Sequence, residues 1–241
     1  MKVVRFLAGD ASLVVELRRR WTAVLTGGGG ATLAARGPVR VTLGVPVALA
    51  ELPPSPWVAI DIQWFAARED ALAGEDWLGA ADAALCLGSS LVGAGSCRVV
   101  AEEVVGRGQD HLDARWSDGG ERLKMMSFGR RHASLSAEEF SARWRGEAGR
   151  LGGERMPDEV RGSAYVQNHP VRLDGGEWPF DAVNEVYVDG IDDLRRRAAW
   201  MAARPPAGRS GAAPLMSPDA TWSLGVRESV LPSGDPSDLV S

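Results

Sequence analysis

The stretch Val45-Pro46-Val47 recurs as His169-Pro170-Val171, with every residue number higher by 124. The same shift places Asp61 on Glu185 without a gap. In each copy an extended segment runs into the proline, and a loop then leads to a second extended segment at the same spacing. An internal repeat of this kind predicts that the chain contains two copies of one structural unit.

Around this anchor, the pattern of apolar residues predicts the order strand, helix, strand, strand, helix, strand in each copy. In the first copy the expected elements are 3–8, 11–25, 39–45, 57–65, 76–87 and 97–105. In the second copy they are 123–128, a helix from 136, 163–169, 182–188, 191–203 and 221–231. Ser136, followed three residues later by Glu139, has the capping-box pattern that opens a helix.

The βαββαβ order predicts an α+β fold made of two tandem ferredoxin-like halves. Each half would form a four-stranded antiparallel sheet with helices on one face, which leaves the other face bare. The halves are therefore expected to pack sheet to sheet as a pseudo-dimeric α/β barrel. The expected boundaries are an N-terminal half at 1–106, a linker at 107–121, an EthD-like C-terminal half at 122–231 and a flexible tail at 232–241.

The composition is that of an ordinary globular protein, with 45% hydrophobic and 24% charged residues among 241. A net charge of −5 argues against nucleic acid and anionic membrane surfaces as partners. The most apolar stretch, 80–94, is interrupted by Asp82 and is too short to span a bilayer. The first residues lack a secretory signal pattern, which predicts a cytoplasmic protein. Cys86 and Cys97 are expected to be buried thiols in that reducing compartment.

From Lys124 onward the sequence resembles the EthD family of the dimeric α/β-barrel superfamily. The matching residues are Gly129-Arg130-Arg131, the segment 135–140, Trp144, Tyr165-Val166-Gln167-Asn168-His169 and Glu185. They cover a little under half of the chain, and the histidine that commonly follows the helix tryptophan by four residues is replaced by Ala148. The superfamily includes polyketide cyclases, cofactor-independent oxygenases, isomerases and haem enzymes. The resemblance therefore implies a specific fold, but it is compatible with many different reactions.

Strand alternation places four polar side chains toward the space between the two expected sheets, namely Asp61, Gln63, Glu185 and Tyr187. A carboxyl group in an apolar cavity has a raised pKa, which suits acid/base chemistry near neutral pH. Asp61 and Glu185 are therefore the leading acid/base candidates. Tyr187, Gln63 and His169 are expected to polarise a substrate carbonyl.

Alternative interpretations remain open for these residues. Both carboxylates could instead pair with buried arginines such as Arg5, Arg98 or Arg227 and hold the halves together. Glu103 and Glu228 also match across the repeat, and the same two interpretations apply to them. His169, at a strand end, either reaches the pocket rim as a general acid or base or bonds to loop backbone. The first copy has Val45 at the matching position, so two pockets would differ in their chemistry.

Four tryptophans on or beside the expected strands suit the walls of a pocket for a flat polycyclic ligand, namely Trp57, Trp64, Trp178 and Trp222. Core packing is the alternative, and it is favoured for Trp64. Asn168 is a further candidate for substrate binding. Scattered histidines without ligand spacing predict no metal site, and the lack of phosphate-loop or dinucleotide signatures predicts no bound cofactor.

These features predict a secondary-metabolism enzyme of polyketide or antibiotic biosynthesis, acting on a hydrophobic aromatic small molecule as a monomer or homodimer. The preferred reaction is acid/base cyclisation, dehydration or decarboxylation, as in a cyclase or lyase. The alternative is a cofactor-independent or reduced-flavin-dependent oxygenase or C–C-cleaving enzyme. In the cofactor-independent case the substrate phenolate supplies the electrons that reduce O₂. A non-catalytic binding protein for a hydrophobic metabolite is the third hypothesis.

Overall fold

The computed structural model describes residues 1–25, 37–73, 95–146, 150–151, 154–172, 177–203 and 214–231. The predicted helix at 76–87 and the predicted tail at 232–241 lie outside these residues, as does Cys86.

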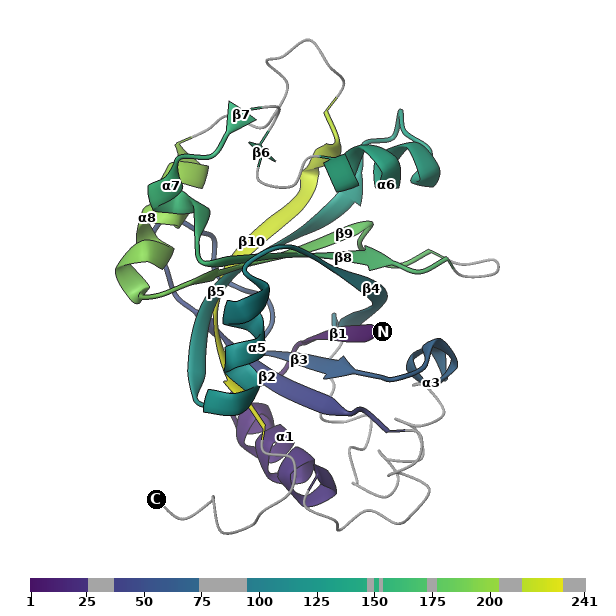
Figure 1. The fold of residues 1–241 in the computed structure, drawn as a ribbon, viewed down its shortest axis with the longest axis vertical. Coiled ribbons are helices and arrows are strands. Elements are labelled where there is room, and N and C mark those ends of the chain that lie inside the picture. Colours follow the sequence, from purple (N-terminus) through teal and green to yellow (C-terminus); the bar gives the residue numbers. More distant parts are fainter. Residues whose placement is uncertain are drawn as a thin grey trace.

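Eight antiparallel strands close into one barrel (Figure 1). They are β1 (Lys2–Leu7), β2 (Arg40–Val47), β3 (Ala59–Trp64), β4 (Cys97–Arg107), β5 (Glu121–Arg131), β8 (Ala164–Pro170), β9 (Ala182–Val188) and β10 (Met216–Val230). Around the barrel they follow the order β1-β3-β2-β10-β5-β9-β8-β4, and β4 pairs with β1 to close the ring. The α+β class and the barrel are thus confirmed.

Each of the two parts of the chain contributes one continuous set of four strands to the barrel. Strands β4-β1-β3-β2 come from the first part of the chain, and β10-β5-β9-β8 come from the second part. Pairing of β2 with β10 and of β4 with β8 joins the sets at both edges. Because both joints are hydrogen bonded, the barrel has no free sheet edge within these strands.

Helices cover the outside of the barrel. They are α1 (Ser12–Ala23), α3 (Arg68–Leu72), α5 (Gln109–Asp118), α6 (Ala137–Gly146), α7 (Asp158–Arg161) and α8 (Ile191–Ala202), and a short ribbon joins β6 (Arg150–Leu151) to β7 (Glu154–Arg155). Leu13, Leu17 and Trp21 share one face of α1 and pack against outward-facing residues of neighbouring strands. On α8, Leu194 packs against the barrel in the same way.

Helix α5 occupies the segment expected to be a linker. It begins after Gly108, whose φ of +76° is a left-handed conformation that favours glycine. A Cβ at this position would lie 2.3 Å from the carbonyl oxygen of Ser163, so the close approach also requires glycine. The polar composition of 107–121 hid a helix whose buried residues are Leu112 and Arg115.

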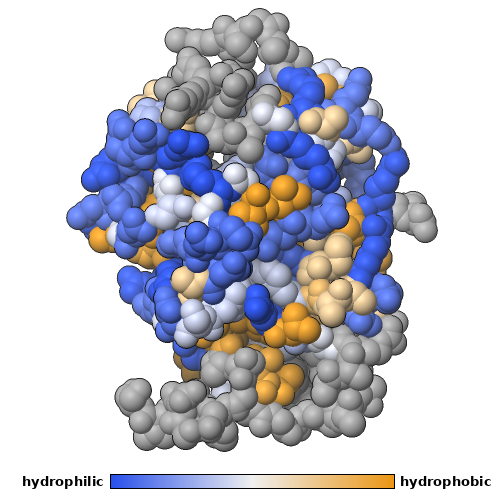
Figure 2. Space-filling view, in the orientation of Figure 1, coloured by the Kyte–Doolittle hydropathy of each residue, from blue (hydrophilic) through white to orange (hydrophobic). Residues whose placement is uncertain are grey.

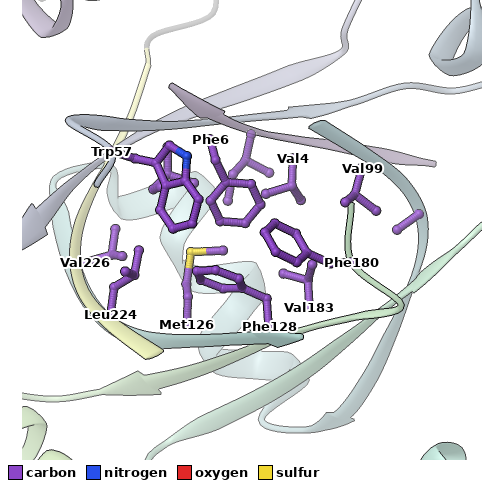
Figure 3. Close-up of a cluster of buried hydrophobic side chains, with 13 residues drawn as sticks. Val4, Phe6, Trp57, Val99, Met126, Phe128, Phe180, Val183, Leu224 and Val226 are labelled. Atoms are coloured by element: carbon purple, nitrogen blue, oxygen red, sulfur yellow. The ribbon is translucent and has the colours of Figure 1, made fainter. Parts of the chain in front are cut away.

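The inward-facing side chains at one end of the barrel form an apolar core. Figure 3 shows Phe6, Trp57, Phe128 and Phe180 grouped inside the ring of strands. Hydrophilic side chains cover most of the described part of the face in Figure 2, and apolar ones gather there in small separate groups. None of the helices in the described ranges is both long and apolar enough to cross a membrane.

Candidate functional site

The sequence contains two lysines, Lys2 and Lys124, and both side chains are completely buried inside the barrel. Lys2 opens β1, and Lys124 lies in β5. A lysine is almost never fully buried unless its ammonium group is paired. The interior must therefore supply carboxylates to both.

Glu185 of β9 bridges the two lysines. Its Oε1 accepts a hydrogen bond from the Lys2 ammonium group, and its Oε2 accepts one from Lys124 Nζ at 2.6 Å. Each lysine has a second carboxylate partner: Lys2 Nζ lies 2.7 Å from Glu103, and Lys124 Nζ lies 2.5 Å from Glu228. The five groups form a chain in which negative and positive charges alternate.

Tyr187 and Arg115 complete this charged network. Arg115, on α5, donates a hydrogen bond to the Tyr187 hydroxyl at 2.5 Å and lies 3.9 Å from Glu228. The same hydroxyl lies 3.0 Å from Glu228 Oε2 and 3.2 Å from Glu185 Oε2. The charged network thus holds three cations and three anions, which balances the charge of a site with little access to water.

Pairing keeps the carboxylates ionised in spite of their burial. Burial alone would raise the pKa of Glu185, but Lys124 and Lys2 hold it well below its ordinary value. The pKa of Glu228 is lowered in the same way, with Lys124 and Arg115 outweighing burial. Burial, Glu185 and Glu228 raise the pKa of Tyr187 well above its ordinary value, so the phenol stays neutral. Glu185 is therefore ionised, and it lacks the raised pKa that the sequence predicted.

One end of the charged network lies close to solvent. The side chain of Glu103 is 23% exposed and accepts a hydrogen bond from the Trp64 indole at 3.2 Å. The Arg115 guanidinium lies 4.3 Å from the ring centre of Trp116 and 4.9 Å from that of Trp64. Helix α5 and these two tryptophans therefore cover the charged end of the barrel, and Glu103 is its contact with water.

Aromatic rings occupy the opposite end of the interior. The ring of Phe128 lies 4.7 Å from that of Phe6, 4.8 Å from that of Phe180 and 5.3 Å from that of Trp57. Trp222 completes this aromatic cluster, stacked at 6.2 Å on Phe128 with 37% of its surface exposed. The rings make a flat-walled apolar environment, with Trp222 at its rim.

The charged network and the aromatic cluster share the same strands. Lys2 and Phe6 both point inward from β1, and Lys124 and Phe128 both point inward from β5. Four residues of strand separate each pair, or about 13 Å at roughly 3.3 Å per residue. Between the two groups lies an apolar layer that includes Met126.

Asn168 of β8 lies where the two groups meet. Its amide nitrogen donates to the Val183 carbonyl at 3.1 Å and to Glu185 Oε1 at 2.8 Å. Val183 belongs to the apolar core at the aromatic end, whereas Glu185 is the centre of the charged network. Asn168 therefore links the apolar core to the charged network.

The structure brings together six of the residues that the sequence singled out. Glu185, Tyr187, Asn168, Trp64, Trp57 and Trp222 lie in or beside the interior. Trp178 packs against the same core from a loop, and its indole nitrogen donates to the Val171 carbonyl at 2.7 Å. The catalytic and binding roles assigned to these residues stay predictions.

Asp61 and Gln63 were predicted to point inward, and this placement is wrong. The register pairs Thr42 with Ile62 in the first part of the chain, and Val166 with Glu185 in the second. The two paired residues lie 20 positions apart in the first copy and 19 positions apart in the second. The connection between the two strands is therefore one residue longer in the first copy, and a match without a gap does not allow for this. Ile62, rather than Asp61, corresponds to Glu185, and a slip of one residue moves every side chain to the other face.

Asp61 lies between the barrel wall and α1. It accepts hydrogen bonds from Gln63 at 2.8 Å and from Arg5 at 3.3 Å, and Trp21 of α1 bonds to the same carboxyl group. Burial raises its pKa, although Arg5 opposes that effect. The arginine pairing considered as an alternative is therefore observed for Asp61.

His169 lies on the outer face of β8, beneath α6, rather than at a pocket rim. Its ring centre is 4.3 Å from that of Trp144, and its Nε2 is 3.2 Å from Gln167 Oε1. Burial and the nearby Arg145 lower its pKa to about 4. The histidine is thus a neutral packing residue at physiological pH.

Glu103 and Glu228 belong to the site, and their match across the repeat was noted from the sequence. The site also includes Lys2, Lys124 and Arg115, to which the sequence analysis assigned no role. One signal was present, because every basic residue other than these two lysines is arginine or histidine, and both lysines fall in strands.

Among the described residues, no group of three His, Cys, Asp or Glu is arranged to hold a metal ion. A groove outside the barrel runs beside α5 and is lined by His111, Asp118, Arg122 and neighbouring residues.

Comparison with solved structures places this barrel among known folds. The chain is similar to an anthrone oxidase-like protein, with a TM-score of 0.54 and 12% identity over 95% of this chain and 92% of that one. It is also similar to a protein from Lactobacillus acidophilus NCFM described as a "putative monooxygenase", with a TM-score of 0.47 and 11% identity over 97% and 96%. No family model and no curated protein matches the chain. The fold is therefore shared with the anthrone oxidase-like protein, and the EthD resemblance stays a prediction.

Proposed function

We propose that this protein is a small-molecule oxygenase or oxidase that binds a hydrophobic hydroxyaromatic compound inside the barrel. The observation that carries the proposal is the meeting of the aromatic cluster and the charged network in one interior, at Asn168. The anthrone oxidase-like name of a protein with the same fold supports this choice of reaction over acid/base cyclisation.

The aromatic cluster recognises flat rings. Its members are large apolar rings that gain from burying and stacking against another aromatic surface. Because these rings pack against one another, a ligand must turn some of them aside. Trp222 is the ring best suited to move, since it lies at the rim and is 37% exposed. Entry at this end brings the ligand toward Asn168.

The charged network supplies electrostatics rather than a strong base. An ionised Glu185 with a depressed pKa is a poor acceptor of a phenolic proton. The Lys2 and Lys124 ammonium groups, fixed where there is little water, favour negative charge on a substrate oxygen or on reduced oxygen. Because three carboxylates balance the cations, the network does not act as the base, and the proton of the bound substrate passes to water.

The substrate anion left after the proton has passed to water can reduce O₂ directly. One electron passes from the substrate anion to O₂ and leaves a substrate radical and superoxide, which combine to form a peroxide. Loss of water from a peroxide at a CH₂ carbon gives a carbonyl group, so that R₂CH₂ and O₂ yield R₂C=O and H₂O. The substrate supplies the electrons, and the protein confines and orients the intermediates.

The test is oxygen uptake with a panel of hydroxyanthracenes and hydroxynaphthalenes. Uptake that equals product formation is expected for the wild-type protein, with a large loss in Glu185→Gln and Lys124→Gln. Arg196→Gln, which removes an exposed ion pair to Asp193, is the matched control and should retain full activity. Conversion without oxygen uptake would instead support a cyclase, dehydratase or decarboxylase. Stoichiometric recovery of unchanged compound would support a binding protein.

We also propose that the barrel consists of two ferredoxin-like units in one chain. Each set of four strands has the order fourth, first, third, second along its own part of the chain, which supports this proposal. Lys2 and Lys124 then occupy matching positions. Lys2 pairs with Ala101 and Lys124 pairs with Val226, so these two partners match as well. Glu103 and Glu228 each lie two residues after a matched partner, and they therefore also match. Glu185 has Ile62 as its counterpart, so the two ends of the network differ.

A further inference from the structure

The side-chain oxygen of Asn168 is a buried acceptor that no donor among the described residues reaches. The residue itself is completely buried. An unpaired amide oxygen in such a place destabilises the fold, and native proteins rarely leave one unexplained. The contacts described above for this residue use only its nitrogen.

The orientation of the amide group follows from its partners. Its nitrogen lies 3.1 Å from a backbone carbonyl oxygen and 2.8 Å from a carboxylate oxygen of Glu185. Both partners are acceptors, and Glu185 is ionised, so a donor must face them. Exchanging the oxygen and nitrogen would bring two repelling acceptors together. The unpaired atom is therefore the oxygen.

We propose that Asn168 Oδ1 accepts a hydrogen bond from a hydroxyl group of the bound ligand and so selects hydroxyaromatic compounds over their methyl ethers. This inference rests on the proposed function, because it uses the same interior and the same ligand class. Asn168 lies between the apolar core around Val183 and the charged network around Glu185. A ring held in the aromatic cluster would direct its hydroxyl toward this junction.

The selection has a physical basis. A phenolic hydroxyl is a donor, and it would satisfy the one unpaired acceptor at the junction. A methyl ether has no donor, so it would leave Oδ1 unpaired and bring an additional methyl group against it.

The test is anaerobic binding of 2-naphthol, 2-methoxynaphthalene and 2-methylnaphthalene, measured by calorimetry with the full chain. The wild-type protein should bind 2-naphthol about tenfold more tightly than either analogue, which corresponds to roughly 1.4 kcal/mol. In Asn168→Ala the preference should shrink to about twofold or less. Asn184→Ala is the matched control, because Asn184 is a neighbouring asparagine whose amide oxygen already accepts from Tyr165, and it should keep the preference.

The outcomes separate this inference from the proposed function. A preference that survives in Asn168→Ala would overturn the role of Asn168, and so would equal binding of all three compounds to the wild-type protein. If Asn168 had only a structural role, Asn168→Ala would weaken the binding of all three compounds by the same factor. That result would also overturn the inference. If Asn168→Ala fails to fold, the wild-type series and Asn168→Leu still decide. Selective binding without oxygen uptake would leave the inference standing and overturn the oxygenase reaction.

Discussion

Replacing Lys124 by Met tests whether the charged network holds the barrel together. The substitution keeps an unbranched side chain of similar length and removes the ammonium group between Glu185 and Glu228. At 2.6 Å, the Lys124–Glu185 pair attracts by about 6 kcal/mol at an effective dielectric constant of about 20. Desolvation of the ions offsets much of this, and the loss of one partner of a buried pair typically costs about 3–5 kcal/mol.

That loss would be large for a chain of this size. A free energy of unfolding of about 5–15 kcal/mol is usual, and each kcal/mol lowers Tm by roughly 2–4 °C in a protein of 150–250 residues. Lys124→Met should therefore melt about 6–20 °C below the wild-type protein at pH 7. Arg196→Met is the control, because its pair with Asp193 is solvent-exposed and should contribute about 0–1 kcal/mol.

The pH dependence of the same variant gives an independent check. In the wild-type protein the pKa values of Glu185 and Glu228 lie below those of the unfolded chain. Their contribution to stability is therefore present above the unfolded pKa of about 4.3 and is lost as pH falls through the folded values. Urea unfolding should show the two proteins converging in stability as pH falls below that value. Equal stability at pH 7 would refute the paired, buried arrangement.

Three further predictions concern other parts of the molecule. Acetylation with an amine-reactive ester should leave Lys2 and Lys124 unmodified in the native protein and modify both in urea, as read by peptide mass spectrometry; rapid native modification of either would show that the interior is open. His169→Gln should flatten the loss of stability of the wild-type protein between pH 6.5 and about 4, because the folded pKa of His169 is lowered and the unfolded chain binds the extra proton; an unchanged slope would contradict its burial. Gly108→Ala should destabilise the protein by at least about 1–2 kcal/mol in urea unfolding, since φ is +76° and Ser163 blocks the new methyl group; a neutral effect would mean that α5 starts differently.

Regular structure was predictable because it depends on local pattern. The predicted strand 182–188 coincides with β9, and the helix predicted at 191–203 matches α8 to within one residue. The inward face of β9 was also predicted, since Glu185 and Tyr187 alternate with outward-facing residues. In β3 the inward face is apolar and the polar residues face α1, so polarity indicated the wrong side.

The charged network could not be assembled from the sequence. Its ion pairs join residues 61 to 183 positions apart, and one of its cations comes from a helix expected to be a linker. The alternation of side chains along a strand shows which face of the sheet a residue lies on, but it does not show which residue it contacts across the barrel. For the same reason the expected rise in the pKa of Glu185 was reversed, because burial was foreseen and the two lysines were not.

A crystal structure of the protein with 2-naphthol bound is the most direct test of the central claim that the barrel interior is the functional site. The ring should lie among Phe6, Trp57, Phe128 and Phe180, with its hydroxyl within hydrogen-bonding distance of Asn168 Oδ1. Binding confined to the outer groove beside His111 and Arg122, with the interior unchanged, would contradict the claim.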